Sequence, residues 1–413
     1  MSAPSLARAI ASAAVDRTVL MERHGPLIEL ARRLLGVEAF CYPFLEIWPT
    51  SLRTYNLLVP NFVDVPFSLL GFGPSMGLRG TGMYAASLVA QCMYCSAHSC
   101  VVAQRGQANR GTLARIQDDD AGETPGERAL LAVARGMASV PSSVRAEDVR
   151  ALDEAYGRSD ADWLAHAIAM MGFLNKMMDT MGFDLEQAII DENGDLAPSS
   201  GWTPGRHDVV EDGRPRVADA GSPKRMVWSM LRFMPAAIST DKRWTKGIPT
   251  KADRATALLQ EISGYDFPML SGIRQGRVVR ALTTMLRDNL VADDSVLGMQ
   301  SKHLAGLHYV SGLQNPAFLD GARVLARHAG LCDTAIEAAV DGRVEDTEGS
   351  PALEASFALA SAAAPSPAKI TTELVDTVTT GLEPAQLIEL MTWFSLLSLL
   401  NRVDAFQQAR AAA

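Results

Sequence analysis

Two long segments of this chain resemble each other, and an internal repeat constrains the fold more strongly than any single motif does. The earlier segment runs from 127 to 179 and the later one from 354 to 405. In each, an Ala-rich amphipathic stretch ends at a proline, Pro141 or Pro367, and a second amphipathic stretch follows. The third stretch of each contains Leu-Asn followed by Lys or Arg. We therefore expect two copies of one helical unit.

The repeat extends upstream, to a stretch that holds most of the cysteines. Residues 78–95 (LRGTGMYAASLVAQCMYC) have a counterpart in residues 301–318 (SKHLAGLHYVSGLQNPAF). The pairs that this alignment makes are Arg79 with Lys302, Cys92 with Asn315, and Cys95 with Phe318. The second copy thus keeps the scaffold and lacks the sulfur atoms, so the fold does not need these cysteines.

The chain of 413 residues is longer than a single hydrophobic core usually supports, which agrees with two domains. Between the copies, residues 191–225 are rich in Gly, Pro, Ser and Asp, a composition typical of a linker or a long surface loop. We place the boundary near residue 220, with one domain over 1–220 and the other over 221–413. Apolar residues recur at helical spacing, so both domains should be all-α.

Charge and hydropathy exclude several classes of protein. A formal net charge of -9 and a pI near 5.4 provide no basic surface for nucleic acid. The N-terminal residues lack the pattern of a secretion signal, and the longest apolar run, 390–400, is shorter than the roughly 20 residues that a spanning helix needs. The odd number of cysteines does not suit a disulfide framework. We expect a cytoplasmic protein with no membrane partner.

The stretch QCMYCSAHSC, residues 91–100, carries three of the five cysteines. No proline separates it from the apolar stretch before it, so Cys92 lies either inside one helix or at the start of the next. At 100° per residue, Cys92 and Cys95 are about 60° apart and His98 is about 60° further round the same face. Cys100 lies roughly 160° from His98, on a different face.

This cluster has three possible interpretations. Small buried cysteines can simply fill a core. A structural zinc site would need four ligands, and no second Cys or His pair supplies them, because Cys41 and Cys332 are isolated. We therefore expect no metal and no cofactor. The favoured interpretation is thiol redox chemistry, in which a helix N-terminus and an imidazolium would lower a thiol pKa to about 7 or below. A second thiol would resolve the oxidised first one.

The motif Cys-x-Tyr-Cys-x-x-His, with Arg79 thirteen residues and Ser87 five residues before Cys92, resembles the alkylhydroperoxidase D-like, carboxymuconolactone decarboxylase-like family. Residues 173–182 (FLNKMMDTMG) are similar to the segment that closes the helical unit of that family. Residues 322–342 are similar to the family's Ala-Arg-x-x-Gly-Leu-Ser-Asp stretch. The resemblance covers 50–190, and more loosely 250–410.

This resemblance implies an all-helical protein that forms homo-oligomers and uses a Cys-x-x-Cys dithiol. In the family the second cysteine, here Cys95, attacks, the first, here Cys92, resolves, and the histidine, here His98, relays protons. The chain departs from the family pattern at Gly80, where peroxidase members carry a glutamate that ends the proton relay. It also has Ser99 at the position where the best-known reductases carry their histidine.

Other residues could contribute to a site, although each has an ordinary structural explanation. His303 aligns with Gly80 in the second copy, and His166 lies on the third helix of the first unit; both are more simply buried structural histidines. The aromatic stretches 41–49 and 62–73 could line an apolar pocket or belong to the core.

We therefore expect a thiol-dependent peroxidase or disulfide reductase that acts on a small peroxide or disulfide and is reduced by a thiol donor protein or a small thiol. One alternative is a lyase or decarboxylase-like enzyme of the same family, which would keep its activity without Cys92 and Cys95. Another is a non-catalytic redox sensor, which would oxidise once without turning over.

Overall fold

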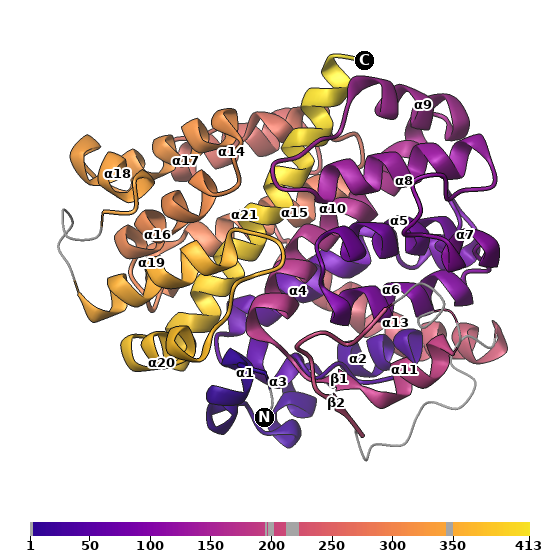
Figure 1. Cartoon of the computed structure of the whole chain (residues 1–413), viewed down its shortest axis with the longest axis horizontal. Helices are drawn as coiled ribbons and strands as arrows, with labels where there is room; N and C mark the ends of the chain where they lie inside the picture. The colour runs from indigo at the N-terminus through magenta and orange to yellow at the C-terminus, as the bar shows by residue number, and fades with distance from the viewer. Residues whose placement is uncertain (1–2, 195, 197–201, 212–222, 344–349) are drawn as a thin grey trace.

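The computed structural model describes residues 3–194, 196, 202–211, 223–343 and 350–413. Helices dominate these residues, which confirms the predicted all-α class (Figure 1). The strands in the described part are two short segments, β1 (Leu185–Glu186) and β2 (Val209–Val210), which pair in parallel. The boundary predicted near residue 220 lies outside the described residues.

The helices follow one another in the order that the repeat predicts. The α-helices up to residue 193 are α1 (Leu6–Ala9), α2 (Arg17–Leu35), α3 (Tyr42–Leu45), α4 (Pro49–Phe62), α5 (Met76–Val89), α6 (Met93–Arg105), α7 (Arg110–Ala114), α8 (Pro125–Ala138), α9 (Ala146–Tyr156), α10 (Arg158–Met181) and α11 (Gln187–Asn193). The later ones are α13 (Pro223–Trp244), α14 (Ala252–Ser263), α15 (Gly276–Leu290), α16 (Met299–Ser311), α17 (Pro316–His328), α18 (Asp333–Val340), α19 (Pro351–Ala363), α20 (Thr372–Gly381) and α21 (Pro384–Ala411). Short 3₁₀ helices are η1 (Ala11–Ala13), η2 (Phe67–Leu70), η3 (Pro268–Gly272) and η4 (Ala292–Asp294).

Residues that the repeat aligns hold equivalent positions in the structure. The α5–α6 turn and the α16–α17 turn each pass through a glutamine in the left-handed region, Gln91 (φ 54°) and Gln314 (φ 56°). The next residue is the N-cap: the Cys92 thiol accepts a hydrogen bond from the Cys95 N–H, and the Asn315 amide oxygen accepts one from the Phe318 N–H. An N-cap residue accepts a hydrogen bond through its side chain. The Cys92 sulfur does so in the first repeat, and the Asn315 amide oxygen does so in the second.

Helices α10 and α21 cross at the centre of the molecule and join the two repeats (Figure 1). Gly172 of α10 makes the close approach possible, because a Cβ there would come within 2.8 Å of the Ser398 carbonyl oxygen of α21. The apolar run 390–400 is the buried middle of α21, as a helix that is hydrophobic on all sides requires. Within the described residues, no helix combines the length and hydropathy needed to cross a membrane.

The described part of the segment predicted as a linker lies against the first repeat. Trp202 donates a hydrogen bond to the Ser96 hydroxyl of α6 (2.7 Å), and Arg206 forms an ion pair with Asp179 of α10 (3.2 Å). His207 is buried and donates a hydrogen bond from Nδ1 to the Phe183 carbonyl (2.7 Å). This segment therefore covers the N-terminal end of α6, where the cysteine motif lies.

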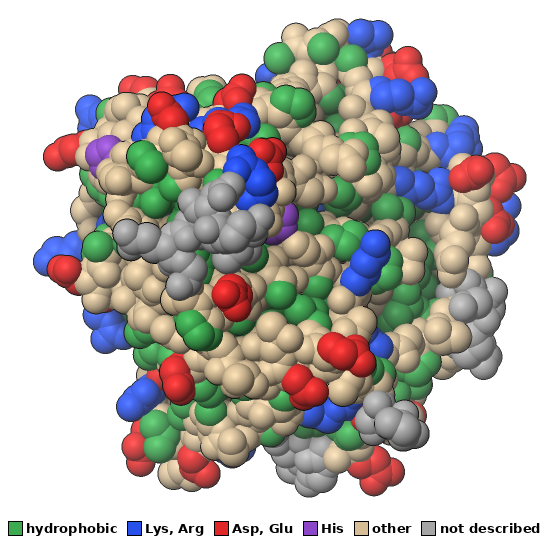
Figure 2. Space-filling model, turned by 60° about the vertical axis from the view of Figure 1, so that its left-hand side comes forward, with side chains coloured by type: hydrophobic (Ala, Val, Ile, Leu, Met, Phe, Trp, Pro, Cys, Tyr) green, Lys and Arg blue, Asp and Glu red, His purple; other side chains and the backbone are tan. Residues whose placement is uncertain are grey.

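Charged side chains of both signs are interspersed over the face of the molecule in Figure 2. This face presents no continuous basic surface, in agreement with the acidic composition. The buried core runs through both repeats without a break, so the two sets of helices share one hydrophobic interior.

Candidate dithiol site

The turn between α5 and α6 fixes the two cysteines of the motif. The Cys92 N–H donates to the Ser87 carbonyl (3.0 Å), and the Cys92 sulfur accepts from the Cys95 N–H (3.3 Å). The Ser87 hydroxyl in turn bonds Asn175 of α10 (3.1 Å). Cys92 is thus the N-cap of α6, which decides between the two placements that the sequence left open. Cys95 lies in the first turn, where the helix dipole favours negative charge.

The two thiols differ in their surroundings. Both are buried, but Cys95 and His98 line a cavity of about 880 Å³, whereas Cys92 and Cys100 are not among the lining residues. Because Cys92 has extended rather than helical backbone angles (φ -85°, ψ 95°), the shared helical stripe holds only for Cys95 and His98. A molecule in the cavity would therefore reach Cys95 first.

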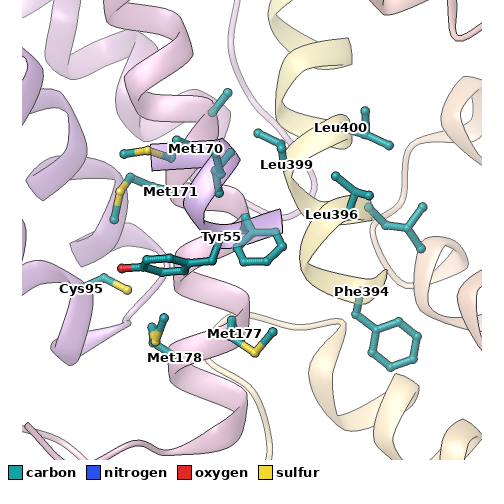
Figure 3. Close-up of a cluster of buried hydrophobic side chains, with 14 of the residues drawn as sticks. Tyr55, Cys95, Met170, Met171, Met177, Met178, Phe394, Leu396, Leu399 and Leu400 are labelled. Atoms are coloured by element: carbon teal, nitrogen blue, oxygen red, sulfur yellow. The ribbon is translucent and has the colours of Figure 1, made fainter. Parts of the chain in front are cut away.

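Most of the cavity wall is apolar, and Met170, Met171 and Met178 of α10 are part of it. In Figure 3 the Tyr55 side chain extends toward Cys95 among the methionines of α10. Parts of both aromatic stretches also line the cavity, through Tyr42 and through residues 65–69, so they contribute to the pocket as well as to the core. The apolar and aromatic side chains that line the cavity together with Cys95 include Tyr42, Tyr55, Met83, Tyr94, Met170, Met171, Leu174 and Met178.

Helices outside the first repeat complete the cavity. Helix α13 contributes Ala237 and Lys242, and α15 contributes Arg277 and Arg280. Arg277 is anchored by Asp64 (2.8 Å) and by the Val65 carbonyl (2.7 Å) of the first repeat. The cavity is consequently lined from both predicted domains, with charged groups on its α13 and α15 side and the dithiol motif on its α6 side.

A buried carboxylate that the sequence analysis did not identify lies against His98. Glu186 of β1 is fully buried, and its Oε2 is 3.2 Å from His98 Nε2. Its Oε1 accepts hydrogen bonds from the Tyr94 hydroxyl (3.1 Å) and the Phe40 N–H (3.0 Å). The Tyr94 and His98 rings are stacked, with centroids 4.5 Å apart. Glu186 is 88 residues beyond His98 and carries no motif, so only the fold reveals it.

Position 80 has no room for the glutamate that the resemblance implies. A Cβ on Gly80 of α5 would lie 2.5 Å from the Ala103 backbone nitrogen of α6, closer than real Cβ contacts. Glycine is therefore required where these two helices meet. The adjacent Arg79 is fully buried, and its guanidinium stacks on Trp163 of α10.

Burial reverses the expected protonation states of the motif. The pKa of the Cys95 thiol is raised well above its ordinary value, mainly because of burial and secondarily because of Cys92. Burial, with a smaller effect of Arg105, lowers the pKa of His98 to about 4. The expectation of an imidazolium that lowers a thiol pKa was wrong, because both groups are removed from water. The resting site holds a neutral thiol beside a neutral imidazole.

Two buried cations lie on the central helices near the motif, and one of them, Arg402, moderates this effect. Lys176 of α10 donates to the Pro365 carbonyl (2.9 Å) of the second repeat, and burial lowers its pKa to about 8. Arg402 of α21 is also buried, and its charge acts to lower the pKa of Cys95. These are the Lys and Arg of the two Leu-Asn-Lys/Arg segments, so the second repeat contributes to the electrostatics of the first.

The remaining candidates lie outside this arrangement. His303 packs edge-on against Trp393 and lines a separate cavity of about 190 Å³. His166 is buried and shares a hydrogen bond with Gln275 (3.0 Å). Neither lines the larger cavity. In the part of the chain that the structure describes, no three His, Cys, Asp or Glu side chains are grouped so that they could hold a metal ion.

Comparisons with known proteins add little. No protein-family model matches the chain, and no curated protein matches it. Among solved structures, the apo debrominase Bmp8 is similar at 20% sequence identity and a TM-score of 0.38, over 44% of this chain and 96% of that chain. A TM-score this low supports no inference about fold or activity.

Proposed function

We propose that this chain is a thiol-dependent oxidoreductase in which Cys95 reacts with a small-molecule peroxide and Cys92 resolves the product. One observation carries the proposal: Cys95 lies on the wall of an apolar cavity, in the first turn of α6, with the sulfur of Cys92 against its backbone nitrogen. Two thiols three residues apart at a helix start can form a disulfide with little rearrangement.

The reaction proceeds in two steps. The Cys95 sulfur attacks the terminal peroxide oxygen, the O–O bond breaks, and the leaving alkoxide takes a proton to become an alcohol, which leaves Cys95 as a sulfenic acid. The Cys92 thiol then attacks the Cys95 sulfur, forms the disulfide and releases water. An external small-molecule thiol returns both cysteines to the reduced state by disulfide exchange.

Because the Cys95 thiol is neutral at rest, its proton must leave as the S–O bond forms. His98 is one helical turn away, lines the same cavity and is neutral, so it is available as the general base. The cavity has the size of a typical small-molecule site, which suits a peroxide with an apolar body. A protein disulfide would have to enter the same buried route, so a small molecule is the better substrate.

The test is mass analysis of the reduced protein before and after one equivalent of cumene hydroperoxide. The wild type should lose two hydrogens through a Cys92–Cys95 disulfide, while Cys92→Ser should stop at the Cys95 sulfenic acid, trapped with dimedone. Cys95→Ser should form neither product. Cys100→Ser serves as a control, because Cys100 is buried outside the cavity and its loss should leave disulfide formation intact.

The pH dependence provides a second check on the same proposal. Since burial raises the pKa of Cys95, its alkylation by iodoacetamide should keep rising with pH above 9 instead of reaching a plateau near 7. Exposed Cys332 should be alkylated first, and its rate serves as the reference for a solvent-exposed thiol. If peroxide oxidised Cys332 and left residues 92 and 95 reduced, the dithiol mechanism would be refuted.

A further inference from the structure

We infer that the cavity binds a long-chain carboxylate, with its apolar chain toward Cys95 and its carboxylate at the cavity mouth, held by Arg280 of α15 and Lys242 of α13. These two side chains belong to a part of the cavity that the dithiol chemistry does not use. The hydroperoxide of such a carboxylate would be the oxidising substrate, a step that rests on the proposed function. The binding itself needs no thiol and is tested separately.

The cavity is closed and apolar at the end where Cys95 lies. The lining side chains there, Cys95, Met170, Met171 and Met178, are at most 3% exposed, and Tyr55 lies among them (Figure 3). A hydrocarbon chain gains free energy when it leaves water for such surroundings. A charged group does not, because an unpaired charge is costly to bury. This end therefore suits the apolar part of a ligand.

The cavity opens to solvent between η2 and α13. Phe67 of η2 and Ile238 of α13 both line it, and they are 50% and 42% exposed. Lys242 follows Ile238 by four residues, so the two side chains lie on the same face of the helix. Lys242 is also exposed and lines the cavity. A charged head group at this mouth stays close to water while its chain is buried.

An ion pair brings Arg280 to the same side of the cavity. The Arg280 Nη2 donates to Asp241 Oδ2 (2.8 Å), and Asp241 is the residue before Lys242. The Arg280 Nε is buried, and among the described residues it has no hydrogen-bond partner. A buried donor that is left unsatisfied costs free energy, and an oxygen of a ligand would satisfy it.

The charges around the cavity favour an anion. The charged side chains among the described lining residues are four cations and one carboxylate, in a chain of formal net charge -9: Arg105, Lys242, Arg277, Arg280 and Asp241. Arg105 forms an ion pair with Glu192, which does not line the cavity. Arg277 uses its nitrogens to bond Asn61, Asp64 and the Val65 carbonyl. Arg280 and Lys242 are therefore the cations best placed to bind a ligand.

A carboxylate matches these two side chains better than a larger anion does. Its two oxygens share a single charge, and one donor from each of two neighbouring helices can satisfy them. Asp241 already neutralises part of the Arg280 charge, which disfavours a doubly charged phosphate monoester. Phe67 and Ile238 provide apolar surface at the mouth for the first methylene groups of the chain.

Binding is measured by displacement of cis-parinaric acid, a fluorescent long-chain carboxylate, from the reduced full-length protein. Dodecanoate should displace it at least about tenfold better than methyl dodecanoate, because the ester keeps the chain and lacks the charge. The affinity should rise about fourfold for each methylene group from octanoate to dodecanoate, the effect of burying one methylene. Equal displacement by dodecanoate and its methyl ester would overturn the inference.

Arg280→Met should weaken dodecanoate binding by about tenfold or more, because it removes a charge-assisted hydrogen bond. The matched control is Arg287→Met. Arg287 is another arginine of α15 that is paired with an aspartate, Asp288 (2.6 Å), and it does not line the cavity. Its loss should leave dodecanoate binding within about twofold of the wild type, the scatter expected of an independent site. Equal losses in the two variants would contradict a head-group site at Arg280.

Asp241→Asn separates a binding role of Arg280 from a structural one. The change keeps the shape of the side chain and removes the negative charge beside Arg280, so dodecanoate should bind more tightly than to the wild type. If the ion pair only held the wall in place, Asp241→Asn and Arg280→Met would both weaken binding, which would overturn the inference. The comparison of acid and ester uses the wild type, so it decides the question even if a variant does not fold.

The outcomes distinguish this site from the proposed function. If dodecanoate binds as described but no peroxide forms the Cys92–Cys95 disulfide, the proposed function fails and the carboxylate site stands. If cumene hydroperoxide forms the disulfide but dodecanoate binds no better than its ester, the site fails and the proposed function stands. When both hold, linoleic acid hydroperoxide should oxidise Cys95 faster than its methyl ester does, and Arg280→Met should abolish this difference. Equal rates in the wild type would overturn the assignment of the carboxylate as substrate.

Discussion

The distance between two helix backbones determines which residue types a position in their contact can hold. Gly80 is the clearest case, because its neighbour across the helix contact is the Ala103 backbone and not the flexible end of a side chain. The glutamate expected there by resemblance is excluded by space. Glu186 is accepted elsewhere because two hydrogen-bond donors compensate for its burial.

We expect Gly80→Ala to lower the free energy of unfolding by about 1–3 kcal/mol, the usual cost of overpacking. The added methyl must displace α5 from α6, and no rotamer change relieves the contact. Denaturant unfolding followed by circular dichroism measures the effect. Gly25→Ala in α2 is the control: its Cβ would meet only the Met21 methyl at 3.6 Å, so it should be neutral or slightly stabilising. Equal stability of the two variants would contradict the packing argument.

At the scale of elements, each repeat buries one cation at the same aligned position, and the two cations have different partners. In the second repeat, Lys302 of α16 is buried and forms an ion pair with Glu389 of α21 (3.0 Å). The Glu389 carboxylate also accepts hydrogen bonds from the Val296 and Leu297 N–H groups. When α10 is aligned with α21 by their Asn175 and Asn401, Trp163 of α10 falls at the position of Glu389 in α21. The buried cation of the first repeat, Arg79, therefore faces an aromatic ring instead of a carboxylate.

Glu389→Gln should lower the free energy of unfolding by about 3–5 kcal/mol, since it leaves the Lys302 charge buried without its counter-ion. The control is Glu337→Gln, which removes one partner of the exposed Arg323 pair and should cost less than about 1 kcal/mol. Urea unfolding curves for both variants give the comparison. A loss below about 1 kcal/mol for Glu389→Gln would show that the buried pair contributes no more than a surface one.

At the scale of the whole molecule, the cavity is lined from both halves of the chain. Its wall includes side chains from α2, α4, α5, α6 and α10, and also from α13 and α15. The arrangement therefore gives the second predicted domain, which lacks the Cys-x-x-Cys pair, a part in forming the site. It also makes the outer half of the cavity a place where substrate size can be tested without touching the dithiol.

Ala237→Trp should slow oxidation of Cys95 by cumene hydroperoxide at least tenfold relative to hydrogen peroxide, because the indole fills the α13 side of the cavity and small peroxide still passes. The neighbouring Ala236→Trp is the control, since Ala236 does not line the cavity. Stopped-flow measurement of both peroxides with each variant gives the ratio. An unchanged ratio in Ala237→Trp would mean that the substrate does not occupy this part of the cavity.

Much of the local structure could be predicted from the sequence. The repeat fixed which helices correspond, and the pairing of Cys92 with Asn315 is matched by two N-caps that bind the N–H three residues later. The spacing of Cys95 and His98 placed them on one face of a helix, and both line the cavity. These properties depend on residues within one or two turns of each other, where helical geometry alone relates sequence to position.

The site as a whole could not be predicted in this way. Glu186 meets His98, and Arg277 reaches Asp64, only because the chain folds back over long distances, and no periodicity records such contacts. The pKa directions of Cys95 and His98 were missed for the same reason, since desolvation depends on everything packed around a group. The sequence by itself determined an all-α chain built on a repeat, with a Cys-x-x-Cys pair either inside a helix or at a helix start. Only the tertiary structure decided that the Cys95 thiol is neutral at rest, lines an apolar cavity and lies one helical turn from a histidine with a buried carboxylate beside it, because these properties arise from packing between distant segments.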